Sequence, residues 1–91
     1  MTISEAYNVL HVDAGVNDEL IVALIDALPS YIETTTGLPE NKQHLEPLVN
    51  TVEGFILTLW YYADHADDQA LNRTIDALLK AITVRARAYA E

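Results

Sequence analysis

Residues 20–32 read LIVALIDALPSYI, and their apolar side chains recur every three or four positions. That spacing matches the period of an α-helix, so the segment is predicted to be an amphipathic helix with one buried face. Asn17 or Asp18 is the expected N-cap. Pro29 predicts a kink, because it removes a backbone donor and clashes with the carbonyl four residues earlier. The apolar face comprises Leu20, Ile21, Leu24, Ile25, Leu28 and Ile32.

The flanking residues predict where this helix ends and where an earlier one begins. Thr2 followed by Glu5 matches a capping box, so a first, short helix should start there and end before the break at 12–17. Gly37 and Pro39 are expected to end the second helix, and residues 37–44 are predicted to form a loop.

Two more helices are predicted, at about residues 45–63 and 69–89, because both segments repeat apolar residues with helical spacing. The third is apolar on almost every side, which indicates a helix central to the fold or covered by another subunit. The chain is therefore predicted to be one all-α domain, residues 1–91, with a short N-terminal helix followed by three longer packed helices. The face of the third helix comprises Leu45, Leu48, Val49, Val52, Phe55, Ile56 and Leu59, with Leu57 outside it.

Charge is unevenly distributed along the chain, whose formal net charge is −9. Residues 1–68 carry twelve acidic side chains and one basic one, whereas residues 69–91 carry four basic and two acidic ones. Nucleic acids and anionic membranes attract basic proteins, so both are disfavoured as partners. Opposite charge at the two ends suits head-to-tail contact between copies or an acidic partner. The helix dipole, which favours cations near a C-terminus, is an alternative reason for the basic end.

Catalytic and cofactor signatures are missing from the sequence. There is no cysteine, and the three glycines are isolated, so thiol chemistry and a phosphate-binding glycine loop are excluded. His11 and His44 have no acidic partner or nucleophile motif nearby. No signal peptide or membrane span is predicted, which favours a reducing cytoplasm. We expect no enzyme activity and no cofactor.

Asp64, His65, Asp67 and Asp68 form the densest polar cluster. Carboxylates and imidazole are ligands for divalent metals, but such sites usually draw ligands from one helix face or from separate elements. A solvated turn between helices is the simpler interpretation, and no metal site is predicted.

Trp60, Tyr61 and Tyr62 are consecutive aromatic residues, a type that favours both cores and protein interfaces. Successive residues of a helix point about 100° apart, so the three cannot share one face. We expect two in the core and one at the surface, where it contacts a partner.

The order of these features resembles the small head–tail connector, or adaptor, proteins of tailed bacteriophages and related prophages. The resemblance covers nearly the whole chain as a pattern of helices with short matches. The matching segments are Leu10-His11-Val12-Asp13, Asn17 to Ile21, Tyr31-Ile32-Glu33 with Thr36-Gly37-Leu38-Pro39, Ile56 to Tyr62, and Ile75 to Leu79.

The resemblance implies a structural virion protein, made in the bacterial host cytoplasm, that forms a homo-oligomeric ring under the portal protein. The ring would continue the DNA channel without binding DNA specifically and would dock tail or stopper proteins. Acidic residues lining such a channel would repel DNA and let it slide, although net charge also serves solubility. We expect subunit contacts at the aromatic set and at Arg85 and Arg87. Replacing both arginines by Glu should leave the monomer folded and impair assembly.

Two other functions fit the same sequence. A non-viral acidic helical adaptor or inhibitor would bind one protein partner in a fixed small complex, as DNA mimics do. A small metal-dependent enzyme would need a stoichiometric ion at the Asp64–Asp68 cluster.

Overall fold

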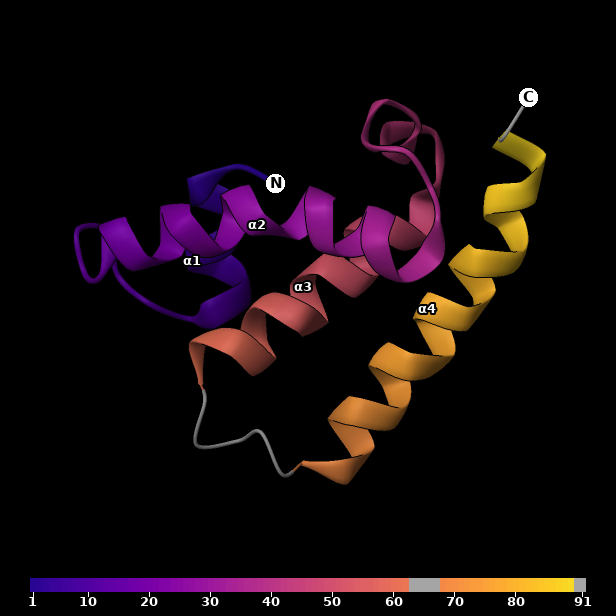
Figure 1. The fold of residues 1–91 in the computed structure, drawn as a ribbon. Helices are drawn as coiled ribbons and strands as arrows, with labels where there is room; N and C mark the ends of the chain where they lie inside the picture. The colour runs from indigo at the N-terminus through magenta and orange to yellow at the C-terminus, as the bar shows by residue number, and fades with distance from the viewer. Residues whose placement is uncertain (63–67, 90–91) are drawn as a thin grey trace.

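The computed structural model describes residues 1–62 and 68–89. In this part of the chain the regular elements are helices, with no strand, so the predicted all-α class is confirmed. Figure 1 shows their arrangement. In chain order they are α1 (Ile3–Leu10), α2 (Asp18–Thr36), the 3₁₀ helix η1 (Glu40–Leu45), α3 (Pro47–Tyr61) and α4 (Gln69–Tyr89).

The capping box predicted for α1 is present. The Glu5 N–H donates to Thr2 Oγ1 at 3.2 Å, and the Thr2 N–H donates to Glu5 Oε1 at 3.0 Å. Both bonds satisfy backbone donors that the first turn of a helix leaves unpaired. The helix ends at Leu10, and the C-cap residue His11 adopts the left-handed conformation with φ 57°.

The second helix continues through Pro29 from Asp18 to Thr36. The helix ends where the sequence predicts. Gly37 has φ 80°, a conformation that glycine adopts without steric cost, and its N–H donates to Glu33 O at 2.8 Å. Asn17, one of the two predicted N-cap residues, is the N-cap; it has φ 57° and makes no side-chain capping hydrogen bond.

The loop predicted for residues 37–44 is wrong in part, since Glu40–Leu45 forms the 3₁₀ helix η1. The Lys42 N–H donates to Pro39 O, three residues back, at 2.9 Å. The buried Gln43 amide donates to Pro29 O at 2.8 Å and to Leu38 O at 3.2 Å. The bond to Pro29 depends on α2 lying close to η1. The spacing of apolar residues in the sequence does not predict such a contact.

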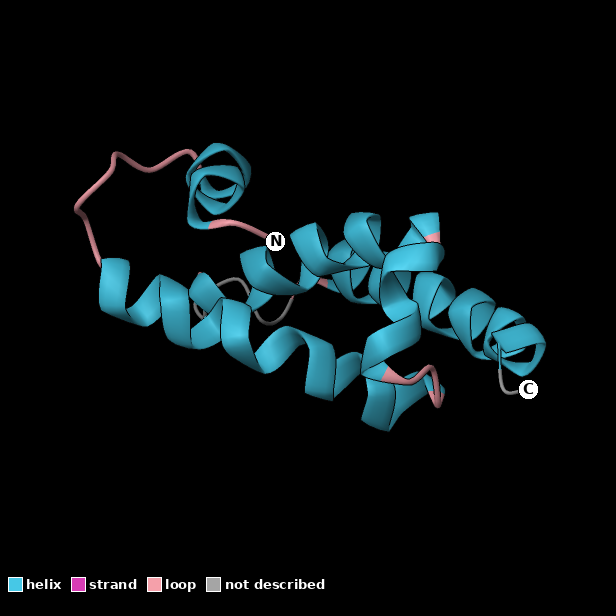
Figure 2. Ribbon diagram, turned by 90° about the horizontal axis from the view of Figure 1, so that it is seen from above, coloured by secondary structure: helices cyan, strands magenta, loops and turns pink. Residues whose placement is uncertain are grey.

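Two apolar clusters make up the core, and α3 contributes to both, as expected of a central helix. Ile56 lies in the cluster shared with α2 and α4, whereas Leu57, the next residue, lies in the cluster shared with α1 and α2. Figure 2 shows α1 at the opposite end of the molecule from the last turns of α4. The first cluster is Leu28, Ile32, Leu38, Val49, Val52, Ile56, Ile75, Ile82 and Ala86; the second is Ala6, Leu10, Ile21 and Leu57.

Three residues predicted on buried faces are exposed instead. Leu20 and Leu45 are each 49% exposed, and Phe55 is 37% exposed. Leu45 belongs to η1, so it does not extend the face of α3. Phe55 precedes Ile56 and Leu57 and therefore points about 100° or more away from both buried directions of α3. None of the helices in the described ranges is long and apolar enough to span a bilayer.

Candidate functional site

The three consecutive aromatic residues are all partly buried, instead of two being in the core and one outside. Trp60 packs against the first cluster and meets the Tyr31 ring edge-on, with ring centroids 5.2 Å apart. Tyr61 and Tyr62 pack against the second cluster, and their rings also meet edge-on at 4.9 Å. Each ring therefore has partners within its own chain, and a role for these rings in subunit contacts stays a prediction.

The two tyrosines hold the α1–α2 connection against the end of α3. Tyr62 Oη donates to the Leu10 carbonyl at 2.6 Å, and the Asn17 amide donates to Tyr61 Oη at 2.8 Å. Tyr7 Oη donates to Asp18 Oδ1 at 2.7 Å, and this bond raises the pKa of Tyr7. The polar ends of these rings thus satisfy groups in residues 10–18, which sequence analysis did not foresee.

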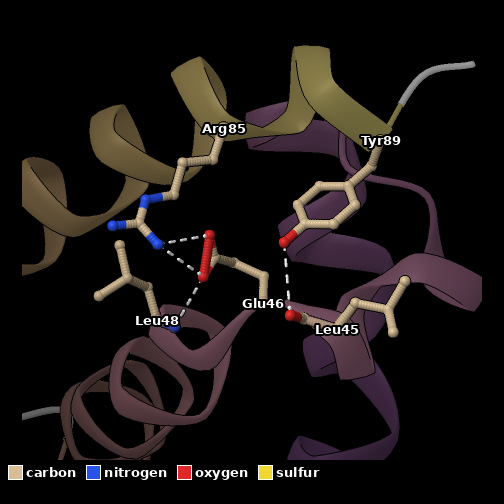
Figure 3. A network of polar contacts seen from close by, with 5 residues as sticks. All are labelled: Leu45, Glu46, Leu48, Arg85 and Tyr89. Atoms are coloured by element: carbon tan, nitrogen blue, oxygen red, sulfur yellow. Dashed lines mark hydrogen bonds and ion pairs between the residues drawn. The ribbon is translucent and has the colours of Figure 1, made fainter.

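Arg85 forms an ion pair with Glu46, 39 residues away in the sequence (Figure 3). Arg85 Nη1 lies 3.0 Å from Glu46 Oε1 and 3.2 Å from Oε2. Glu46 Oε2 also accepts the Leu48 N–H at 3.2 Å, so the carboxylate caps α3. The Glu46 side chain is fully buried, whereas the Arg85 side chain is 56% exposed. Arg85 therefore neutralises a buried carboxylate, although its own side chain is largely exposed.

The expectation that replacing both arginines by Glu leaves the monomer folded stays a prediction, and this ion pair argues against it. Glu at position 85 would place a second carboxylate beside the buried one on Glu46, which is unfavourable in a site with little water. Arg87, in contrast, is exposed and has no hydrogen bond or ion pair to any residue in 1–62 or 68–89. Of the two arginines, Arg87 is therefore the one suited to testing assembly.

Of the polar cluster near residue 64, Asp64, His65 and Asp67 lie outside the described residues. Asp68 is exposed, and its Oδ1 accepts the Leu71 N–H at 3.0 Å at the start of α4. Within the described ranges, no group of three or more His, Cys, Asp or Glu side chains is placed to hold a metal ion.

A pocket of about 290 Å³ contains a buried acid, Glu53, that sequence analysis missed. Burial raises the pKa of Glu53 above its ordinary value. The positive charge of the Met1 ammonium lowers this pKa, and the negative charge of Glu5 raises it further, but both effects are smaller than that of burial. Helical spacing places Glu53 beside Val49, Ile56 and Leu57, and these apolar neighbours are the sequence signal that indicated its burial. The pocket is lined by Met1, Pro29, Glu40, Gln43, His44, Val49, Asn50 and Glu53.

Glu53→Gln is expected to raise the melting temperature at pH 7 and to change it little at pH 4. A carboxyl whose pKa is raised in the folded state favours folding while protonated, and that contribution is lost as the pH rises through the folded-state pKa. Glutamine has the same shape and carries no charge, so the variant escapes this loss. Thermal denaturation at both pH values measures the effect. Asp76→Asn, at an exposed position of α4, is the control, and an equal gain in both variants would contradict the prediction.

Comparison with known proteins adds no relative: the chain matches no protein-family model, no curated protein and no solved structure.

Proposed function

We propose that this protein is a structural virion protein, a head–tail connector that forms a ring under the portal of a tailed bacteriophage or prophage. In this role it continues the DNA channel and docks tail or stopper proteins. The proposal rests on the resemblance described above. An all-helical fold with a central third helix is compatible with it.

The observation that supports assembly most directly is the separation of charge between the exposed faces of two helices. The second helix exposes Glu19, Asp26 and Glu33 and carries no basic residue. The fourth exposes Arg73, Lys80 and Arg87 in addition to Arg85, which pairs with Glu46, and has one acidic residue, Asp76. Complementary patches of this kind guide one copy of a protein onto another and fix the register of contact.

Apolar surface is also available for partners. An interface with a partner would cover some of the large apolar side chains that are exposed on the monomer. Those exposed here are Val16, Leu20, Val22, Tyr31, Leu45, Phe55 and Val84.

Native mass spectrometry of the chain with the portal ring encoded in the same genome tests the proposal. We expect many copies bound per portal ring, at one fixed stoichiometry. An unrelated acidic helical protein of similar size is the control for non-specific adhesion. Failure to bind the portal, or a complex of one copy with one partner, would contradict the connector function; the second result would favour the adaptor alternative.

A further inference from the structure

The outward face of α4 carries a straight row of basic residues. Arg73, Lys80 and Arg87 are spaced seven residues apart, which is close to two helical turns, so they lie along one line. Ala77 and Val84 occupy the intervening positions of the same line. All five residues are exposed, Val84 to 64%. We call these five residues the basic stripe; within the described ranges its cations make no hydrogen bond or ion pair.

The outward face of α2 carries an acidic row with the same spacing. Glu19, Asp26 and Glu33 are also seven residues apart, with Val22 and Ser30 between them. All five are exposed, Val22 to 43%, and we call them the acidic stripe. Glu33 Oε1 accepts the Glu40 N–H at 2.7 Å, which leaves its other oxygen for a further partner. No described cation lies within ion-pair distance of the stripe.

The two stripes carry opposite charges and match in number and spacing. At a rise of about 1.5 Å per residue, charges seven residues apart lie about 10.5 Å apart on either helix, so three ion pairs can form at once. The residues between the charges are small or apolar on both stripes, which lets the helices approach closely. Within one chain the stripes cannot meet, because α2 and α4 already face each other through core residues such as Ile32 and Ile82.

We infer that the acidic stripe of one copy binds the basic stripe of the next, and that this contact is the subunit interface of the assembled ring. The inference rests on the ring assembly proposed above. Because the two surfaces differ, the contact is head-to-tail, and repetition of such a contact produces a closed ring when the rotation closes. The acidic residues of α2 then lie between subunits and do not line a channel.

Such an interface is weak for an isolated pair of subunits and sensitive to salt. Exposed ion pairs contribute little individually and are screened by ions, so self-association should weaken as ionic strength rises. Closure of a ring gives each subunit two such contacts, and an intramolecular second contact strengthens the whole assembly.

Two charge-reversed variants test the interface. The first, R73E/K80E/R87E, makes both stripes acidic; the second, E19K/D26K/E33K, makes both basic. We expect each variant alone to self-associate at least about tenfold more weakly than the wild type, because like charges then oppose each other. An equimolar mixture should recover association, since each stripe then meets its opposite. Sedimentation velocity at low salt measures the masses, and circular dichroism checks that each variant folds.

Further variants control for net charge. The chain with all six reversals keeps the net charge of −9 and should associate like the wild type. Arg87→Glu and Lys42→Glu change net charge equally, but only the first lies on a stripe, so only the first should weaken association. The inference would be overturned if each triple variant assembled by itself. It would also be overturned if mixing the two triple variants did not increase their association.

The outcome for the interface is separable from the outcome for the connector function. Portal binding by variants that still form rings would keep the function and refute this interface. If mixing the two triple variants restores association but the wild-type chain does not bind the portal, the interface is kept and the connector function is refuted. A wild-type chain that stays monomeric at millimolar concentration and low salt, or whose basic stripe binds DNA without self-association, would also overturn the inference.

Discussion

Leu57→Ala is expected to lower the free energy of unfolding by about 3 kcal/mol, the usual cost of removing a buried leucine side chain and leaving a cavity. The Leu57 side chain is completely buried in the small cluster that joins α1 to α3. Its other buried members, Ala6, Leu10 and Ile21, are held in α1 and α2, so they can relax only partly into the space. Urea denaturation monitored by circular dichroism measures the loss.

The same substitution should act locally as well as globally. Amide hydrogen exchange in α1 should accelerate more than exchange in the second half of α4, because α1 packs against the second cluster and that part of α4 against the first. Val84→Ala is the control, since Val84 is 64% exposed and its loss should cost less than about 0.5 kcal/mol. Equal destabilisation by Leu57→Ala and Val84→Ala would show that the second cluster is not a cohesive part of the core.

Arg85→Met is expected to lower the free energy of unfolding by about 2 kcal/mol. The value is below that for a fully buried pair, because water reaches the half-exposed arginine and would partly hydrate Glu46 after its removal. Methionine keeps most of the apolar stem, so the change reports mainly on the charge. Urea denaturation at neutral pH is again the measurement.

Two further variants isolate the ion pair. Arg87→Met removes a cation of the same helix that has no partner among the described residues, and it should change stability by less than about 0.5 kcal/mol. The double variant Glu46→Gln/Arg85→Met should be more stable than Arg85→Met alone, because no buried charge is then left uncompensated. Equal losses for Arg85→Met and Arg87→Met would mean that the pair contributes nothing.

The candidate site shows where sequence reasoning reached its limit. Arg85 and Arg87 look equivalent in the sequence, two basic residues near the end of one helix. The structure separates them, since Arg85 reaches the buried Glu46 at the start of α3 and Arg87 stays exposed. The residue types of the aromatic set indicate its importance. Its contacts, however, depend on the positions of Leu10 and Asn17, which are 52 and 44 residues away from their partners.

The sequence by itself determined the local features of this protein: the capping box at Thr2, the end of α2 at Gly37, and the extent of α4 from Gln69 to Tyr89. Each depends on residues within about one or two turns of each other, so a periodic pattern or a cap is sufficient to specify it. Only the tertiary structure decided that Leu57 packs toward α1 and that residues 40–45 form a 3₁₀ helix. Those outcomes depend on how the helices cross, and the crossing places residues distant in sequence together in ways that no local pattern records.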